Sequence, residues 1–242
     1  MRVAVLSDVH GNLVGLDACL ADLHAQGGAD AIIAAGDLCV DGPKPKKVLQ
    51  RLEEVGAQAV RGNTDRELAA PDGETFHAPE DMQLEWTRRD LGDKWLQWLA
   101  ALPFALRVGE EENQLLVVHA NPTNDFEHLW PDADDAFLER LIGGERATTI
   151  AFGHLHLPYV RVWRGKMLVN VASAGLPKDG DARASYAIFT ERAGGWEVKH
   201  RRVEFDVKKV ATQLADCGIP ESSELIATLR RHRYKRLKGF VP

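Results

Sequence analysis

Hydrophobic residues in the N-terminal part of the chain alternate between short unbroken runs and longer stretches with helical spacing. The runs at residues 2–6, 29–35 and 57–60 are too short for helices and predict buried strands. Leucines three or four positions apart predict a helix over residues 12–26, and residues 45–55 show the same spacing after a proline. This β-α-β-α-β order predicts a parallel sheet covered by helices.

The pattern changes after the third predicted strand. Residues 66–105 contain an acidic segment with Pro and Gly, followed by tryptophans and leucines at helical spacing, which predicts a helical insertion or cap with its own small core. Apolar runs at 114–118 and 148–152 predict two more strands, and residues 125–143 are expected to be helical. The remaining apolar runs predict antiparallel strands and then a helical segment over 207–237.

Composition limits the class of protein. A chain of 242 residues can form one large domain, and we expect a single domain over 1–242. The net charge of -6 gives no overall attraction to nucleic acid or anionic membranes, and no apolar run approaches the length of a membrane span. The three cysteines form no CxxC pair, and charged residues arrive too early for a signal peptide. We therefore expect a cytoplasmic protein.

Five of the predicted strands are followed by residues that can bind metal ions. Ligands in open α/β sheets sit at the carboxyl ends of strands. In extended backbone, side chains two positions apart point to the same side, so each Asp-x-His or His-x-His pair could present two ligands together. Oxygen and nitrogen donors without thiolates suit Mn²⁺, Fe, Zn²⁺ or Ni²⁺. The residues are Asp8, His10, Asp37, Asn63, His119, His154 and His156.

These residue types point to a specific chemistry. Two metal ions about 3.5–4 Å apart can hold a hydroxide between them and bind a phosphoryl oxygen. Such a site needs one carboxylate that bridges the ions, and Asp37, alone after its strand, is the candidate. Taken singly, each residue has an ordinary explanation as a turn former or a buried histidine. That explanation becomes improbable for seven residues placed after five strands.

The ordered motifs DxH, GD, GN, H and GHxH resemble the calcineurin-like metallophosphoesterase superfamily. Residues 170–189 resemble the strand-turn-strand of its small bacterial and archaeal phosphodiesterase-like branch. The resemblance implies a four-layer α-β-β-α sandwich of two mixed sheets, and hydrolysis of phosphate esters by a metal-bridging hydroxide. It implies one metal, for which we favour manganese, on Asp8, His10, Asp37 and His156, and a second on Asp37, Asn63, His119 and His154.

One position departs from the superfamily pattern. Many members have a histidine after Gly-Asn, whereas this chain has Thr64 and then Asp65. A threonine hydroxyl is too weak an acid to replace imidazole, which leaves Asp65, His77 or a metal-bound water to protonate the leaving group. The candidate catalytic residues are therefore Asn63, Thr64 and Asp65. Asn63 and Asn12 are candidate phosphate contacts, although Asn12 could equally be only a helix N-cap.

Two other functions compete with a phosphodiesterase or phosphatase. A non-catalytic scaffold is known on this fold in a retromer subunit, but a scaffold has no need of a complete ligand set. A nuclease is supported only by the basic residues 230–238. We expect a small phosphate ester or nucleotide as substrate, and the oligomeric state stays open. We also expect that truncation after about residue 228 leaves the activity on small substrates nearly unchanged.

Overall fold

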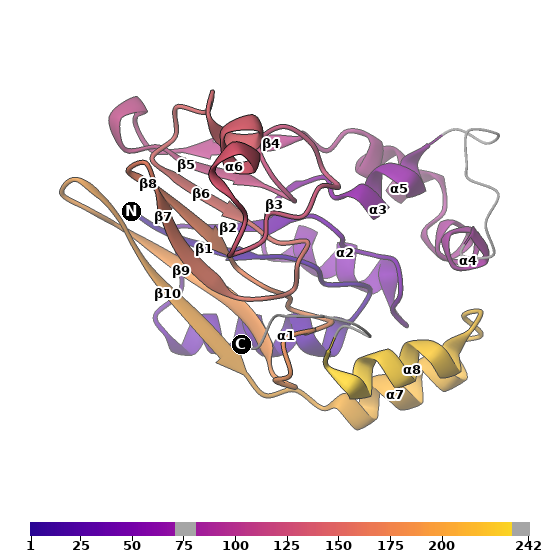
Figure 1. The fold of residues 1–242 in the computed structure, drawn as a ribbon. Coiled ribbons are helices and arrows are strands. Elements are labelled where there is room, and N and C mark those ends of the chain that lie inside the picture. The colour runs from indigo at the N-terminus through magenta and orange to yellow at the C-terminus, as the bar shows by residue number, and fades with distance from the viewer. Residues whose placement is uncertain (71–80, 234–242) are drawn as a thin grey trace.

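The first of two sheets contains the N-terminal strands. The computed structural model describes residues 1–70 and 81–233. The first sheet has the order β10-β9-β1-β2-β3 (Figure 1). Strands β1, β2 and β3 are parallel, whereas β9 runs antiparallel to both β1 and β10, so the sheet is mixed. The bounds are β1 Arg2–Leu6, β2 Ala31–Ala35, β3 Gln58–Val60, β9 Ala184–Arg192 and β10 Gly195–Val203.

The second sheet has the order β4-β5-β6-β8-β7. Strands β5, β6 and β8 are parallel, and β4 and β7 lie antiparallel at the edges. The bounds are β4 Ala105–Val108, β5 Leu115–Val118, β6 Thr149–Phe152, β7 Tyr159–Trp163 and β8 Lys166–Asn170. The expectation that all strands after residue 156 are antiparallel was therefore wrong for β8, whose neighbour β6 comes from the βα part of the chain.

The two sheets pack face to face through fully buried aliphatic side chains. Val3, Val5 and Ile33 of the first sheet share this core with Val117 and Val169 of the second. The alternate residues of β1 point to the other face and join the core beneath the helices. Because both faces of β1 are buried after Arg2, residues 3–6 are all apolar, without the alternation of a half-exposed strand.

Helices cover the outer face of each sheet. Helices α1 (Leu13–Ala25) and α2 (Pro45–Glu54) lie on the first sheet, and α6 (Asp135–Ile142) lies on the second (Figure 1). A short 3₁₀ turn, Glu111–Asn113, precedes β5. The fold is thus an α/β sandwich with two mixed sheets between helical layers, and the α-β-β-α prediction is confirmed.

The segment between β3 and β4 contains three helices, α3 (Asn63–Ala69), α4 (Asp81–Leu91) and α5 (Asp93–Ala100). We expected its tryptophans to form a separate small core. Instead Trp95 joins the buried cluster of α1 and α2, and Trp86 packs against the cluster of the C-terminal helices. These helices extend the outer layer of the first sheet. His77 lies outside the described residues.

The predicted helix over 125–143 is mostly irregular. Only α6 is helical, because the preceding segment is held in a side-chain-to-backbone turn: Asn124 Oδ1 accepts hydrogen bonds from the N–H groups of Phe126 at 3.2 Å and Glu127 at 2.8 Å. Pro131 also lacks the N–H that a helix interior needs. Helix α6 begins after Asp134, whose carboxylate accepts from the Phe137 N–H at 2.8 Å.

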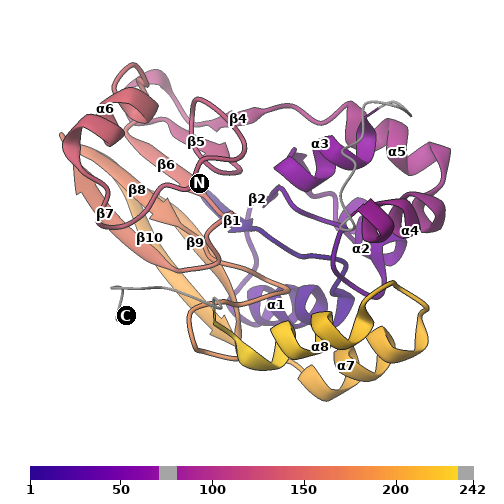
Figure 2. The same cartoon turned by 45° about the vertical axis from the view of Figure 1, so that its right-hand side comes forward.

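The C-terminal helices α7 (Val207–Asp216) and α8 (Ser222–Arg231) pack as a pair. Figure 2 shows them beside α1, on the side of the molecule where α4 lies. Leu229 of α8 is buried with Leu176, Val210 and Leu214. Truncation after about residue 228 would therefore remove a core side chain, and the expected lack of effect does not follow. The predicted helical end at 237 lies outside the described residues.

None of the helices in the described part of the chain combines the length and apolar character needed to cross a membrane.

Leu229→Ala should lower the free energy of unfolding by roughly 2–5 kcal/mol, because the substitution leaves a cavity among buried leucines. Chemical denaturation of the purified variant measures the change. Ser223→Ala, on an exposed position of the same helix, is the control. A loss for Leu229→Ala no larger than that of the control would show that α8 is not anchored through this side chain.

Candidate metal centre

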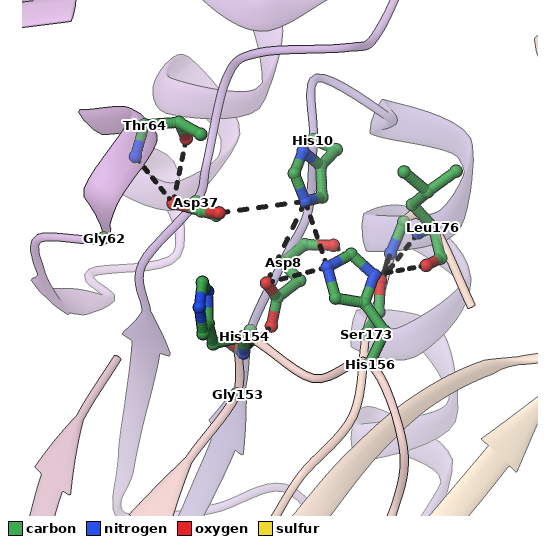
Figure 3. Close-up of polar contacts among 12 residues, drawn as sticks. Asp8, His10, Asp37, Gly62, Thr64, Gly153, His154, His156, Ser173 and Leu176 are labelled. Carbon is green, nitrogen blue, oxygen red and sulfur yellow. Dashed lines mark hydrogen bonds and ion pairs between the residues drawn. The ribbon is translucent and has the colours of Figure 1, made fainter. Parts of the chain in front are cut away.

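The seven predicted ligands lie together at one edge of the sandwich. Figure 3 shows five of them: Asp8, His10, Asp37, His154 and His156. They form two groups, Asp8 with His10 and His156, and Asp37 with His119 and His154, in each of which the ligand atoms lie within 4.8 Å of one another. The Asn63 side chain belongs to the second group, because its Oδ1 lies 3.2 Å from Nε2 of His119. The structure therefore brings together every residue that the motifs predicted.

Each ligand follows directly on the end of a parallel strand. Asp8 and His10 follow β1, Asp37 follows β2, and Asn63 is the first residue of α3 after β3. The ligands His119, His154 and His156 follow β5 and β6 of the second sheet. Because the two sheets are stacked, the carboxyl ends of both sets of strands meet at the same edge.

The backbone at the ligands is left-handed and not extended. The φ angles are 53° at Asp8, 48° at His10, 52° at Asp37, 66° at His154 and 55° at His156. The paired ligands thus reach the same site, but not by the i and i+2 geometry of a strand that we assumed. Non-glycine residues seldom adopt this conformation, and its recurrence at functional sites reflects support from the surrounding structure.

Asp37 stands between the two groups. Its Oδ1 lies 3.4 Å from Nε2 of His119, and its Oδ2 lies 4.0 Å from Nε2 of His10. Oδ1 also accepts hydrogen bonds from the N–H of Thr64 at 3.1 Å and from the Thr64 hydroxyl at 2.8 Å (Figure 3). One carboxylate therefore faces both sets of histidines, as a bridging ligand would.

All four histidines are oriented by backbone carbonyls. His10 Nδ1 donates to Val40 at 3.0 Å, His119 Nδ1 to Ala35 at 2.8 Å and His154 Nε2 to Phe126 at 2.9 Å. His156 Nδ1 donates to the carbonyl of Leu176 (Figure 3). Fixing the outer nitrogen as the donor leaves the lone pair of the inner nitrogen directed into the site, which is the arrangement of metal-binding histidines.

The inner nitrogens face one another at short range. His10 Nε2 and His156 Nε2 are 3.3 Å apart, and His119 Nε2 and His154 Nδ1 are 3.1 Å apart. Two lone pairs at such distances repel unless a cation or a proton lies between them. Asp8 Oδ1 is also buried without a hydrogen-bond partner among the described residues. This donor set fits two divalent cations.

Burial and charge set the protonation of the site. Burial, followed by repulsion from neighbouring cationic groups, lowers the pKa of His154 and of His156 to about 4, so both are neutral near pH 7. Burial opposes ionisation of Asp8 and Asp37, but attraction to the adjacent histidines holds the pKa of both carboxyls below the ordinary value. Burial lowers the pKa of His119, yet Asp37 outweighs this effect and raises the value to about 10.

Two glycines permit the close packing of these loops. A Cβ on Gly62 would lie 2.2 Å from Oδ1 of Asp37. A Cβ on Gly153 would lie 1.9 Å from the Ser7 hydroxyl and 2.3 Å from Oδ2 of Asp8. Such separations are far below van der Waals contact, so glycine is needed for the ligand loops to approach.

The other predicted site residues have defined partners. Asp65 is buried and accepts hydrogen bonds from the N–H groups of Asp37, Leu38 and Gly62 at 2.8, 3.0 and 2.9 Å. Asn12 caps α1 by accepting from the Gly15 N–H at 2.9 Å, and its amide donates to the Gly175 carbonyl at 2.7 Å. The structure shows the capping role of Asn12, and a phosphate contact from it stays a prediction.

Sequence reasoning missed several residues that support the ligands. The Ser173 hydroxyl donates to the Asp8 carbonyl at 2.7 Å and accepts from the Leu176 N–H at 2.7 Å, which fixes the carbonyl that holds His156. The ring centroid of His128 lies 4.2 Å from that of His154. The only sequence signal for the contacts of Ser173 was the resemblance of residues 170–189 to the superfamily's strand-turn-strand.

The comparison with known families agrees with this geometry. Residues 1–194 match the calcineurin-like phosphoesterase superfamily domain, so the chain belongs to this superfamily. It is accordingly an enzyme that hydrolyses phosphate esters. An uncharacterised protein of Methanocaldococcus jannaschii is 29% identical over 238 residues, which cover 90% of this chain and 94% of that protein. A symmetrical bis(5'-nucleosyl)-tetraphosphatase of Pectobacterium atrosepticum is 32% identical over 126 residues, 51% of this chain and 44% of that protein.

Solved structures show the same fold. A metallophosphoesterase from Sphaerobacter thermophilus has a TM-score of 0.77 and 27% identity, over 96% of this chain and 99% of that chain. A hypothetical protein from Pyrococcus horikoshii has a TM-score of 0.82 and 22% identity, over 94% of this chain and 97% of that chain. The second likeness concerns the fold alone.

Asp37→Ala should abolish binding of both metal ions and hydrolysis, because it removes the only carboxylate in the described site that faces both groups of histidines. Elemental analysis of purified protein measures the metal content, and circular dichroism checks the fold. Asp17→Ala, a substitution at an exposed ion pair on α1, should change neither. A variant with normal metal content and turnover would refute the bridging role.

Metal affinity should rise with pH, because a proton and a metal ion compete for Nε2 of His119. The pKa of His119 is raised from 6.5 to about 10, so the metal-free site holds this proton at neutral pH and loses it as the pH rises through about 10. The same proton stabilises the metal-free fold fully below the unfolded pKa, and this contribution disappears above about 10. Affinity should increase by up to ~tenfold per pH unit in this window.

Calorimetry in buffers with different ionisation enthalpies should detect the proton released when metal binds. His154 and His156, already neutral near pH 7, should release none. An affinity that stays constant between about pH 7 and about pH 9 would contradict the competition.

Proposed function

We propose that this protein hydrolyses phosphate esters with two divalent metal ions held by Asp8, His10, Asp37, Asn63, His119, His154 and His156. The observation that carries the proposal is the two facing pairs of imidazole nitrogens at 3.3 and 3.1 Å, with one oxygen of Asp37 near each pair. The ions, when bound, would activate a water molecule and offset the negative charge of the phosphoryl oxygens.

The protein residues contribute position and charge. Asp8 and Asp37 would supply anionic oxygen, while the four carbonyl-bound histidines would supply nitrogen with a fixed orientation. The Asn63 amide is only partly buried at the start of α3, and it would contact a phosphoryl oxygen as well as a metal ion. We favour manganese because this set of oxygen and imidazole donors suits it, with iron, zinc and nickel as alternatives.

The leaving group must stabilise its own negative charge as it departs, because no histidine follows Asn63 to protonate it. The Thr64 hydroxyl is directed at Asp37. Burial and the nearby Asp37 carboxylate raise the pKa of Asp65 to about 6, against three backbone N–H groups that favour its ionised form, so the group is mostly ionised near pH 7. These contacts support positioning roles for both residues over proton donation. Esters with acidic leaving groups, such as aryl esters and nucleotide anhydrides, should therefore be the better substrates.

A small nucleotide is the substrate class that the relatives favour. The Pectobacterium atrosepticum protein bears the name of a symmetrical bis(5'-nucleosyl)-tetraphosphatase, although this chain covers less than half of its length. Hydrolysis of a dinucleoside tetraphosphate would release a nucleoside phosphate, which agrees with the need for an acidic leaving group. We extend this substrate class to the present chain as a proposal.

The experiment is a panel of aryl monoesters, aryl diesters, alkyl phosphates and dinucleoside polyphosphates, assayed with Mn²⁺, Fe²⁺, Zn²⁺ or Ni²⁺. A chelator should remove activity and the ion should restore it. Aryl and nucleotide substrates should react faster than alkyl phosphates by roughly 10²–10⁴-fold, the usual contribution of general acid catalysis. Absence of any divalent-dependent hydrolysis would favour a scaffold, and cleavage of nucleic acid alone would favour a nuclease.

A further inference from the structure

A cavity of about 400 Å³ lies next to the metal centre and contains two arginines. Arg61 and Arg66 line it together with Asp125 and the rings of Phe104 and Phe126. Its volume falls in the range of about 300–1,000 Å³ that is typical of ligand sites. Neither the ligand motifs nor the mechanism proposed above uses this cavity.

The cavity is continuous with the ligand loops on two sides. Arg61 follows β3 two positions before Asn63, and Arg66 stands three positions after Asn63, on the same face of α3. On the opposite wall, the carbonyl of Phe126 accepts the hydrogen bond that orients His154, at 2.9 Å. A substrate whose scissile phosphate reaches Asn63 and His154 would therefore extend into this cavity.

The cavity carries a net positive charge. The Asp125 carboxylate, only 6% exposed, accepts a hydrogen bond from Arg66 Nε at 2.9 Å. Arg61 Nε lies 3.9 Å from the same carboxylate, which is too far for a hydrogen bond, and it has no other hydrogen-bond partner within residues 1–70 and 81–233. One carboxylate thus balances only one of two guanidinium groups.

Both arginines remain accessible although they are held in place. Their side chains are 39% and 41% exposed, so an anion can reach them. Arg61 lies over the ring of Phe104 at 5.9 Å, and Asp125 belongs to the segment that the Asn121 and Asn124 side chains hold in turns. Because the guanidinium groups are already oriented, little side-chain freedom is lost when they bind a ligand.

The chemistry of the cavity matches a nucleoside oligophosphate. A guanidinium group binds phosphate through paired N–H donors, and two of them suit linked phosphates better than one. Phe126 adds an apolar ring that is 56% exposed beside these charges, and bases stack on such rings. A simple monophosphate would place its only charged group at the metal centre and would leave both features unused.

We propose that this cavity is the subsite that binds the phosphates and base of a nucleoside oligophosphate beyond the bond that is cleaved. This inference rests on the proposed phosphoesterase function and adds the residues that would select the substrate. Arg61 and Arg66 bind the phosphates, Phe126 stacks on the base, and Asp125 positions Arg66. A purely structural role of the arginines in joining α3 to the opposite loop would not depend on the length of the substrate.

The test compares Arg66→Ala with the wild type on two substrates, diadenosine tetraphosphate and a small aryl phosphate ester. In Arg66→Ala, kcat/KM for diadenosine tetraphosphate, divided by kcat/KM for the aryl ester, should fall by roughly 10–100-fold. This is the range expected for the loss of hydrogen bonds between charged groups. Arg66→Lys should restore only part of the ratio, because an ammonium lacks the paired donors. Arg51→Ala, which removes an arginine of 38% exposure from α2, is the matched control and should leave the ratio unchanged.

Phe126→Ala tests the base subsite and keeps the backbone carbonyl that holds His154. The substitution should raise the KM for diadenosine tetraphosphate roughly tenfold or more, because the base loses its stacking partner. It should leave inhibition by inorganic tripolyphosphate, which has no base, unchanged. If binding of diadenosine tetraphosphate and of tripolyphosphate weakens by the same factor, the ring does not bind the base.

The proposal fails if Arg66→Ala lowers both kcat/KM values by the same factor or changes neither. If the wild type hydrolyses none of the esters, the proposed function fails first, and binding then decides the subsite. Calorimetric titration of tripolyphosphate into the metal-free wild type and Arg66→Ala should still show weaker binding by the variant. Equal affinity of the two proteins would overturn the subsite.

Discussion

The left-handed backbone at the ligands is the constraint on which the rest of the site depends. Five of the seven ligand residues have φ between 48° and 66°, a conformation that costs roughly 1–3 kcal/mol at a non-glycine position. Backbone hydrogen bonds between neighbouring loops hold it. The Asp8 N–H donates to Gly36 at 3.0 Å, His10 to Asp37 at 3.0 Å and Gly153 to His119 at 2.8 Å. The stacked strand ends supply these partners, so the order of strands in both sheets is a condition for the site.

The same logic extends to the groups that orient the ligands. Each ligand histidine donates its outer N–H to a backbone carbonyl: Ala35 at the end of β2, Val40 in the loop after β2, Phe126 or Leu176. These distant segments all contribute to the donor geometry. Asp65 links the loops after β2 and β3 by accepting from N–H groups in both. Metal affinity should therefore respond to residues that never touch a metal ion, as is common for such supporting contacts.

The surroundings of the centre differ on its two sides. Near His10, the C-terminal helices close a small cavity of about 140 Å³ that Lys178 and Leu229 also line. Near His154, the larger cavity with Arg61 and Arg66 opens beside the start of α3. The metal ligands are general for phosphate chemistry, whereas these two cavities differ from each other in size and lining residues. Selection among phosphate esters is therefore expected from the flanking residues.

The sequence by itself predicted most of the strands, the candidate ligands and the family. Short apolar runs predicted β1, β2, β3, β5 and β6 because these strands are buried on both faces, and polar residues directly after them marked the site. The tertiary structure alone decided the left-handed ligand backbone, the irregular segment before α6 and the packing of Trp86 and Trp95 into shared cores. It also decided that Arg61, Arg66 and Asp125 meet. Periodicity reports which faces of an element are buried, but contacts between distant segments depend on how the two sheets stack, and a local pattern does not encode that stacking.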